Sequence, residues 1–517
     1  GTLPYAWTLS GGALPPGVQL GAAGIITGVP TASGLYTATA QLSDGEGFTV
    51  TRNLDLTVHA SYVKPVVNAP VFEVATVGVP VAYTVTALNY PKTFTITGLP
   101  AGVTARSTGL ISGRPSVSGV FLVKIKAANP AGSSTVVTVP LVVKALPNGL
   151  VGTFTGIINR DATANGGLGS RLSLTTAVNG FYTARVTTGA LTRQVTGWLA
   201  ASAPHISTTV GPAPLSLTLD KDSQLVSGTH GAAAVSGWRS TWNATSNPAT
   251  HRIGYYSAAL ALADTGDIGS PAIPQGHGFA TFSVASSGAL TVAGKTADNQ
   301  TITSAGFIGP AGEIAVYTPL YGNQGSVLGQ WTLSEEAGGQ FAGNSVSGAL
   351  TWRKPATTGY TYAAGFGPVN VAVAGKYLAP NAKGEVLGLP EAGTADVLFE
   401  QGGVDLSATE ADVTGFTYTD ENKVIVPAAG GVNNAARATL AINKSTGAVS
   451  GTITLVEGSP ALKRTVSFYG QTVRLADPEV KAVGWFLLPQ IPGQGQTLKT
   501  SPVLSGSFLI KQSANAN

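Results

Sequence analysis

Hydrophobic and polar residues alternate along most of the chain in short runs, such as "YTATAQLSD" (residues 36–44) and "FLVKIKAAN" (residues 121–129). A period of two places successive side chains on opposite faces and indicates half-buried strands. Glycine and proline separate the runs, and these residues supply the backbone angles that tight turns need. The pattern therefore predicts an all-β protein built from antiparallel strands.

One stretch of this pattern occurs twice without a gap. "LPPGVQLGAAGIITGVPTASG" (residues 14–34) returns 85 residues later as "LPAGVTARSTGLISGRPSVSG" (residues 99–119), with leucine, glycine and proline in register. We predict that Gly28 and Gly113 share one turn or bulge conformation that a side chain would crowd. Six apolar residues at matching positions are expected to face the interiors of two sandwiches: Leu14, Ile25, Tyr36, Leu99, Leu110 and Phe121.

The spaced Leu-Pro-x-Gly and Gly-x-Ile/Leu-x-Gly-x-Pro pattern over residues 1–146 resembles the immunoglobulin-like, cadherin-like repeats found in tandem in large secreted bacterial surface proteins. The resemblance implies β-sandwiches of about seven strands that serve as spacers or adhesive modules. Cadherins bind calcium between domains through acidic motifs. The junction here, "VHASYVKPVV" (residues 58–67), has no acidic residue, so calcium is not expected to stiffen it.

The same offset predicts that the first sandwich is incomplete. The second repeat opens near Pro70 with "PVFEVATVG" and "VAYTVTAL", whose counterparts would fall at about −15 to +3. Two interpretations stay open: residues upstream of Gly1 were removed or lie outside this sequence, or a strand of a neighbouring copy fills the edge. The predicted assembly edge is made by Gly1, Thr2, Leu3, Pro4 and Tyr5.

From Leu146 onward the alternating runs become longer. Four pairs of runs, each with a polar turn between them, predict β-hairpins at residues 170–186, 213–229, 279–294 and 436–452. Blocks of the form Gly-x-aromatic begin at residues 152, 254, 375 and 484. Segments such as "YTPLYGNQGSVLGQW" (residues 317–331) and "GALTWRKP" (residues 348–355) resemble uncharacterised β-repeat modules of secreted proteins from environmental bacteria, a resemblance that implies no chemistry.

The predicted architecture is two immunoglobulin-like β-sandwiches, the first N-terminally incomplete, followed by antiparallel β-barrel or sandwich domains. The predicted domains are residues 1–60 (a repeat without its first strand), 61–146 (a second repeat), 147–250 (a hairpin-rich domain), 251–370 (a related domain) and 371–517 (a C-terminal β-rich domain).

Composition restricts the partners. The net charge is +4, but residues 61–146 carry seven Lys or Arg against one acid, as scattered single charges without basic runs, so a nucleic-acid partner is not expected. The chain has neither cysteine nor methionine. The absence of cysteine excludes disulfides and thiol chemistry, and the lack of both oxidisable sulfurs suits a secreted protein. The missing methionine also indicates a processed or truncated product. No apolar run approaches the length of a membrane-spanning helix.

Candidate chemistry is sparse. The five histidines are dispersed, and the acidic pairs Asp220/Asp222 and Glu335/Glu336 fall in predicted turns, so we expect no catalytic residues. "ADTGDIG" (residues 263–269), with Asp264 and Asp267, is a weak pattern for a hard cation, and we predict no metal or cofactor. Trp242 and Trp331 are the candidate platform for sugar rings, but the pattern favours the alternative that they fill the core.

These observations favour a non-enzymatic, extracellular structural or adhesive protein of a bacterial surface, in the form of a fibre subunit or part of a surface assembly. Its expected partners are other copies of itself, other cell-surface proteins, or glycans. Two alternatives stay open: a cell-surface carbohydrate-binding protein, and a polysaccharide-active enzyme.

Overall fold

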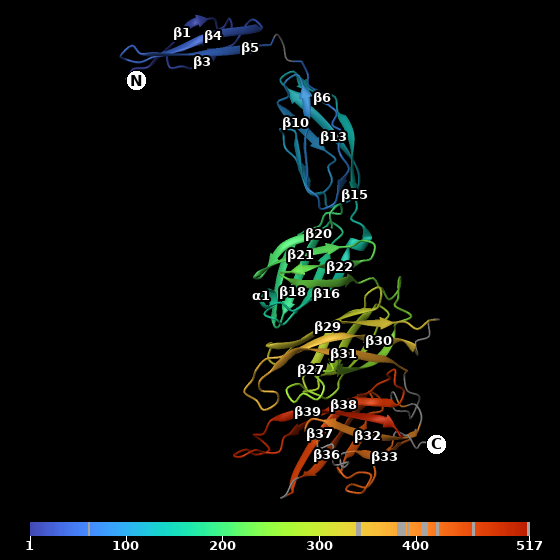
Figure 1. The fold of residues 1–517 in the computed structure, drawn as a ribbon. Helices are drawn as coiled ribbons and strands as arrows, with labels where there is room; N and C mark the ends of the chain where they lie inside the picture. The colour runs from blue at the N-terminus through green and yellow to red at the C-terminus, as the bar shows by residue number, and fades with distance from the viewer. Residues whose placement is uncertain are drawn as a thin grey trace. The chain divides into compact units, whose positions relative to one another are not determined.

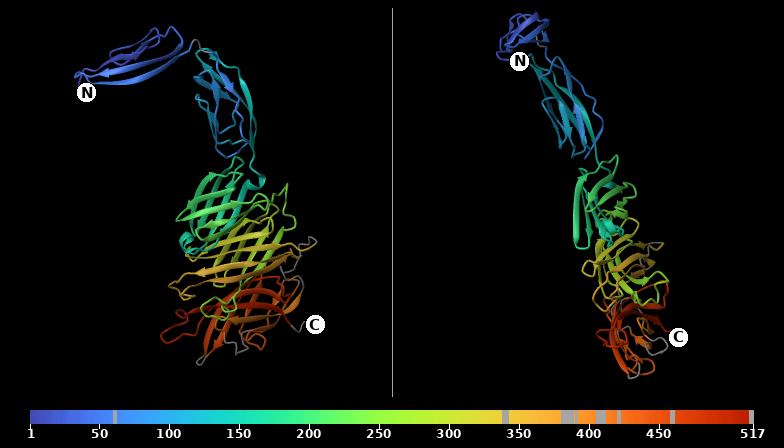
Figure 2. Two further views of the ribbon diagram at one scale, coloured as in Figure 1. Left: turned by 45° about the horizontal axis from the view of Figure 1, so that its top comes forward. Right: turned by 60° about the vertical axis from the view of Figure 1, so that its left-hand side comes forward.

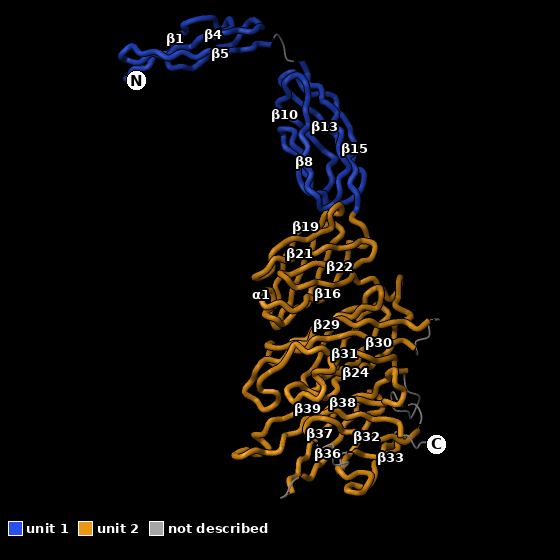
Figure 3. Tube along the Cα trace, viewed as in Figure 1, with its two compact units in different colours: residues 1–145 blue, residues 146–517 orange. Residues whose placement is uncertain are grey.

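The computed structural model describes residues 1–59, 63–337, 343–379, 389, 392–404, 412–419, 423–457 and 461–513. The predicted boundary between residues 60 and 61 lies outside these residues. Nearly every element is a strand, which confirms the all-β prediction (Figure 1). The chain forms two compact units, residues 1–145 and 146–517 (Figure 3). No helix in the described residues is long and apolar enough to cross a bilayer.

The first repeat has two small antiparallel sheets. One is ordered β1-β4-β5 and the other pairs β2 with β3. Opposite residues such as Tyr36 and Leu56 fix the register of the long β4–β5 pair. The strands are β1 (Ala6–Gly12), β2 (Val18–Leu20), β3 (Ile26–Gly28), β4 (Gly34–Ser43) and β5 (Thr49–Val58).

The second repeat is a fuller sandwich. Its larger sheet is ordered β10-β13-β15-β7, with β14 paired to β13, and its smaller sheet is ordered β11-β12-β8; β6 pairs with β9. The strands are β6 (Val66–Asn68), β7 (Ala75–Thr76), β8 (Val81–Thr84), β9 (Thr86–Leu88), β10 (Thr93–Thr97), β11 (Val103–Ala105), β12 (Leu110–Gly113), β13 (Gly119–Asn129), β14 (Gly132–Ser133) and β15 (Val137–Lys144).

The recurring glycines are equivalent, as predicted. Gly28 and Gly113 both have positive φ, at 112° and 142°. A Cβ would lie about as close to the carbonyl oxygen of Gly17 at the first position as to that of Gly102 at the second. Each glycine therefore lets two strands approach at a point where any side chain would collide with backbone.

The core predictions are correct only in part. Leu14 is buried, and Tyr36, Leu99, Leu110 and Phe121 are half-buried. The prediction for Ile25 is wrong, because its side chain is 63% exposed. In β12 the fully buried residue is Ile111, the neighbour of Leu110. Alternate residues of a strand face opposite sides, so a prediction that is wrong by one residue exchanges the inner and the outer positions.

The second unit contains three eight-stranded antiparallel sheets. They are preceded by the short 3-10 helix η1 (Asn148–Leu150). The short helix α1 (Ala162–Asn165) lies between the first and second strands of the first sheet. The first sheet comprises β16 (Gly152–Ile158), β17 (Ser170–Thr176), β18 (Phe181–Thr188), β19 (Leu191–Trp198), β20 (His205–Val210), β21 (Ala213–Leu219), β22 (Leu225–His230) and β23 (Ala233–Arg239).

The other two sheets follow in sequence (Figure 2). The second comprises β24 (Gly254–Leu262), β25 (Gly278–Val284), β26 (Ala289–Lys295), β27 (Thr301–Phe307), β28 (Glu313–Leu320), β29 (Gly325–Ser334), β30 (Ser345–Lys354) and β31 (Phe366–Leu378). The third comprises β32 (Gly393–Gln401), β33 (Val413–Tyr418), β34 (Val424–Ile425), β35 (Thr439–Ile442), β36 (Ala448–Glu457), β37 (Leu462–Thr472), β38 (Val480–Pro489) and β39 (Val503–Gln512).

All three sheets share one topology. The first is ordered β19-β18-β17-β16-β23-β22-β21-β20, so its first strand pairs with its eighth in the middle of the sheet. The same order holds for β24–β31, whereas in the third sheet, ordered β34-β33-β32-β39-β38-β37-β36-β35, the first meander has three strands and the second has five. In each case the chain forms one meander, crosses to the far edge of the sheet and returns to pair with its own first strand. The curled sheet places alternate side chains in a barrel-like interior.

The four predicted hairpins are confirmed as β17–β18, β21–β22, β25–β26 and β35–β36. The Gly-x-aromatic blocks are not consistent markers of a domain start. Gly375 lies in the last strand of the second sheet and Gly484 in the seventh strand of the third. The predicted boundary between residues 370 and 371 falls within β31, whose pairing with β24 and β30 keeps residues 371–378 in the second sheet.

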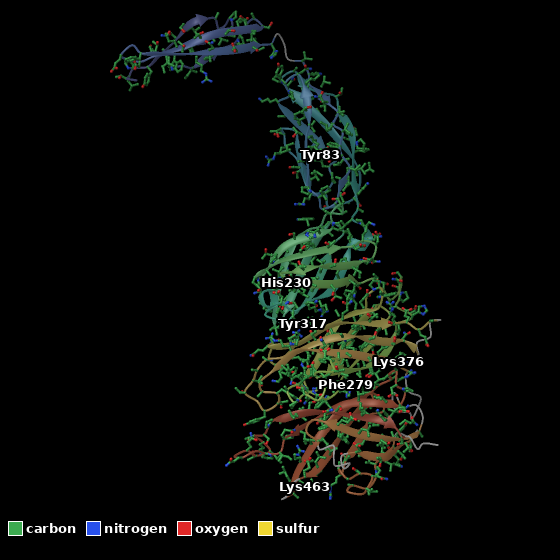
Figure 4. The ribbon with its side chains drawn as sticks, in the orientation of Figure 1. Tyr83, His230, Phe279, Tyr317, Lys376 and Lys463 are labelled. Carbon is green, nitrogen blue, oxygen red and sulfur yellow. The ribbon has the colours of Figure 1, made fainter. Side chains whose placement is uncertain are left out.

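The first and second sheets are joined by a half-buried arginine. Arg160 follows β16, and its guanidinium lies at hydrogen-bond distance from the carbonyl oxygens of Gly167, Leu168, Ser326 and Thr351. Burial lowers its pKa to about 10, so it remains charged at neutral pH. Beside it, Tyr317 packs against Ile157, and its hydroxyl accepts a hydrogen bond from the Gly189 backbone N–H at 2.7 Å (Figure 4).

The second and third sheets share a similar joint. The Ser257 hydroxyl donates to the Thr472 carbonyl at 2.8 Å, and the Ser505 hydroxyl donates to the Ala297 carbonyl at 2.6 Å. Trp485 of β38 contributes to the hydrophobic core of the second sheet. Polar and apolar contacts thus tie each eight-stranded sheet to the next.

Candidate functional site

The predicted assembly edge, Gly1, Thr2, Leu3, Pro4 and Tyr5, folds back on its own domain. The Thr2 hydroxyl donates to the Glu46 carboxylate at 2.9 Å, and the Gly45 backbone N–H donates to the Thr2 carbonyl at 2.7 Å. These bonds attach the segment to the β4–β5 turn. The unpaired strand edges of this domain therefore lie elsewhere.

Two edges of the first repeat lack the partners that the second repeat has. In the second repeat, β8 pairs with β12 and β7 pairs with β15. In the first repeat, β3 corresponds to β12 and β5 corresponds to β15. Within the residues that the structure describes, β3 pairs with β2 alone and β5 with β4 alone. Each outer edge presents backbone N–H and C=O groups that a further strand could bind.

The same comparison identifies an uncovered apolar surface, called here the open face: Leu9, Ile26, Leu54 and Leu56 with the free edges of β3 and β5. Ile111 is 0% exposed, whereas its counterpart Ile26 is 39% exposed. Leu141 is fully buried, whereas its counterpart Leu56 is only half-buried. In the second repeat the cover comes from Val77, Val81 and Val85, all of them buried.

A matched pair of substitutions should reproduce this difference. We expect Ile111→Ala to lower the free energy of unfolding of the second repeat by about 2–5 kcal/mol, because it leaves a cavity in a closed core. Ile26→Ala should cost the first repeat about 1 kcal/mol, because the side chain is already partly in water. Urea unfolding followed by hydrogen exchange in each repeat measures both. Equal losses would show that the two cores are closed alike.

Two segments of the chain, residues 1–59 and 64–144, match the family model described as "Putative Ig domain". Both segments are Ig domains. The match covers the two repeats recognised from the sequence and ends where the first compact unit ends. The prediction of tandem immunoglobulin-like repeats is confirmed, and the open face belongs to the first Ig domain.

No curated protein matches the chain. Among solved structures, the protocadherin gammaB7 EC3-6 cis-dimer aligns at 9% identity over 90% of this chain and 90% of its own, with a TM-score of 0.15. Domains 4–9 of the surface layer protein SbsC align at 10% identity over 97% of this chain and 89% of their own, with a TM-score of 0.18. We draw no inference from alignments with such low TM-scores.

Beyond the Ig domains, the two tryptophans proposed as a sugar platform do not form one. Trp331 is fully buried in the core of the second eight-stranded sheet, near Phe282. Trp242 is half-buried against that core, donates to the Gly309 carbonyl at 3.3 Å and is covered by the Arg252 guanidinium. The alternative that the sequence favoured, in which these tryptophans fill the core, therefore holds for Trp331, and Trp242 packs against that core.

An exposed aromatic pair does occur on the first eight-stranded sheet. Phe181 and Trp198 lie opposite each other on β18 and β19. Their ring centroids are 5.3 Å apart at 73°, and the side chains are 36% and 39% exposed. The sequence offered one signal for this pair, since the predicted hairpin at residues 170–186 already placed Phe181 on a strand.

The acidic candidates have structural partners. The backbone N–H groups of Ser223 and Asp222 donate to the Asp220 carboxylate, which lowers its pKa and stabilises the β21–β22 turn. Glu335 forms an ion pair with Arg252 at 2.6 Å. These contacts are typical of turns and loops.

The predicted cation loop is held together by hydrogen bonds. The Asp264 carboxylate accepts from the Asn370 side-chain amide at 2.9 Å, and the Asp267 backbone N–H donates to the Asp264 carbonyl at 3.0 Å. Among the described residues, no three His, Asp or Glu side chains are grouped as metal ligands would be. Of the histidines, His230 is buried beside the Val210 carbonyl, at 2.9 Å.

Sequence reasoning missed a buried polar network in the second eight-stranded sheet. The Asp298 carboxylate accepts from Thr296 at 2.6 Å and from the Tyr321 hydroxyl at 2.7 Å. The Trp352 indole N–H donates to that hydroxyl at 3.1 Å, and the Lys354 ammonium lies over the Tyr321 ring. Burial raises the pKa of both Asp298 and Tyr321. The network connects the ends of three separate strand pairs, which no local sequence motif reveals.

A cavity of about 400 Å³ opens among three loops of the second unit. Its lining includes Tyr360, Tyr362, Gln496 and Thr500 and contains no charged side chain. The Tyr362 hydroxyl accepts from the Ser505 backbone N–H at 2.7 Å, so this ring is fixed in the wall. The lining offers neither an acid nor a base for catalysis.

Proposed function

We propose that this chain is a non-enzymatic, extracellular structural or adhesive protein of a bacterial surface, and that it joins a surface assembly through its first Ig domain. Tandem Ig domains followed by three interlocked eight-stranded sheets suit a load-bearing or spacing role. The absence of cysteine and methionine is compatible with an oxidising environment outside the cell. The candidate acidic pairs are engaged in turns and loops, which supports a non-catalytic role.

The open face of the first Ig domain carries the proposal. Its sister domain covers the equivalent positions with β7 and β8, so a strand in this position is a normal part of the fold. Backbone groups along β3 and β5 would bind the incoming strand, and Ile26 would be buried beneath it. Strand addition of this kind gives affinity through main-chain bonds and specificity through alternate side chains.

The second Ig domain also defines the chemistry of the partner. Its covering segment buries valines at residues 77, 81 and 85 and keeps Thr84 outward. We therefore propose that the open face accepts an extended segment with small branched apolar residues at this spacing. If another copy of the chain supplies the segment, the contact is head-to-tail, and such contacts propagate into a filament where they do not close into a ring.

A peptide of residues 70–88, "PVFEVATVGVPVAYTVTAL", tests the proposal against the intact chain. We expect it to bind and to slow hydrogen exchange in residues 24–28 and 49–58. A control peptide with Val77, Val81 and Val85 replaced by aspartate should not bind, because it keeps the backbone but loses the apolar side chains. Slowed exchange confined to the second Ig domain, or equal binding of both peptides, would contradict the proposal.

Assembly is measured separately by sedimentation and electron microscopy of the purified chain. If another copy or a surface partner supplies the strand, the peptide should compete with it and shorten or dissolve the assemblies. Assemblies that persist at saturating peptide would show that they form through a different surface.

A further inference from the structure

The outer face of β17, β18 and β19 is distinct from the open face and carries its own chemistry. Inward side chains of β18 are buried at Tyr182, Ala184 and Val186. The intervening residues therefore face outward, and the antiparallel register places each opposite an outward residue of β19. These outward pairs are Phe181 with Trp198, Thr183 with Thr196, Arg185 with Gln194, and Thr187 with Thr192.

The aromatic end of this face is exposed to solvent. All seven tryptophans of the chain lie in described residues, and Trp198 is the exposed one among them. Trp198 and Phe181 form an edge-to-face pair on the surface. Aromatic rings of this kind provide a rigid apolar contact at low entropic cost, and the C–H faces of sugar rings are apolar surfaces that match it.

The other end of the face carries a cation, Arg185, that a hydrogen bond holds in one orientation. The Arg185 Nε–H donates to the Gln194 side-chain oxygen at 2.9 Å, which orients the guanidinium along the sheet. Arg185 is exposed, and it is absent from the ion pairs found among the described residues. Its two terminal nitrogens can bind a carboxylate through two parallel hydrogen bonds.

The charge of the surrounding segment favours an anion. Between Asp161 and Asp220 the sequence holds not one aspartate or glutamate, so no acid of this segment repels an anion at Arg185. Thr183 and Thr196 lie between the aromatic pair and Arg185, and beyond Arg185 the hydroxyls of Thr187 and Thr192 are hydrogen-bonded to each other at 2.9 Å. Four residues along a strand separate Phe181 from Arg185, which corresponds to about 13 Å. A ligand that contacts both ends must be longer than one sugar ring.

We propose that this outer face of β17–β19 binds an anionic polysaccharide that carries carboxylate groups. The sugar rings pack on Trp198 and Phe181, a carboxylate binds Arg185, and ring hydroxyls bond with the threonines between them. The site does not depend on strand addition at the first Ig domain, so either proposal can fail without the other.

Polygalacturonate is the probe, and amylose is the uncharged comparison. Titration of the intact chain by calorimetry should show binding of polygalacturonate that weakens as salt is added, and much weaker binding of amylose. Trp198→Ala and Arg185→Gln should each reduce the affinity about tenfold or more, since each removes one end of the site.

Two control variants keep the test specific. Arg193→Gln removes a neighbouring cation of β19 that faces the opposite side, and Tyr360→Ala removes an exposed aromatic ring of another loop. Both should leave the affinity unchanged, and thermal unfolding should confirm that every variant is folded. An equal loss with Arg193→Gln, equal binding of amylose, or no binding of polygalacturonate would overturn the proposal.

Discussion

Replacing Trp331 with alanine should lower the free energy of unfolding of the second eight-stranded sheet by about 3–5 kcal/mol. The indole is fully buried among core residues, lies near Phe282 and stands opposite Gly348, which offers no side chain to fill the space. Urea unfolding monitored by circular dichroism and hydrogen exchange measures the loss.

Trp198→Ala is the matched control, because it removes the same side chain from an exposed position. We expect it to change the stability by no more than about 0.5 kcal/mol. If Trp331→Ala were equally mild and instead abolished glycan binding, Trp331 would be a ligand platform and the core assignment would be wrong.

Arg160→Ala should loosen the joint between the first and second eight-stranded sheets, at a cost on the order of 3 kcal/mol. The substitution removes the donors for four carbonyl oxygens and for the hydroxyls of Ser326 and Thr351. Buried acceptors without donors are expensive, so the strands on both sides should exchange hydrogen faster. The effect should be concentrated near residues 158–170 and 326–351.

Arg193→Ala serves as the control for Arg160, since it removes an exposed arginine from the same sheet. It should leave both the stability and the exchange pattern unchanged. A cost confined to the first sheet in Arg160→Ala, with no change in residues 326–351, would contradict the assignment of Arg160 as a connection between sheets.

Local patterns in the sequence predicted local structure well. Alternation and turn residues located four hairpins, and the recurrence of Gly28 at Gly113 reported a steric requirement that the structure confirms. Such features depend on residues that are close in sequence. The incomplete cover of the first Ig domain was also foreseeable, because the second repeat supplies an internal reference.

Features that depend on distant contacts were not predictable in this way. The error at Ile25 could be avoided only by knowing the register of β3, which makes Ile26 the counterpart of the buried residue in the second repeat. The end of the second domain could be predicted only by knowing that β31 returns to β24. The orientation of individual tryptophans is a related case, because only the closed sheet shows that Trp331 points inward and Trp198 outward. The Asp298 network joins residues from separate turns that the chain brings together only on folding.

The pairing of first and last strands decides how each domain would respond to tension. In every eight-stranded sheet the chain enters and leaves at the same end of an antiparallel pair, as Phe154 opposite Arg239 shows. Pulling the chain ends would therefore peel these strands apart one hydrogen bond at a time. In the second Ig domain β7 and β15 run parallel, so the same pull would shear their bonds together. The first Ig domain has no such clamp among its described strands, and a partner strand bound along β5 would provide one.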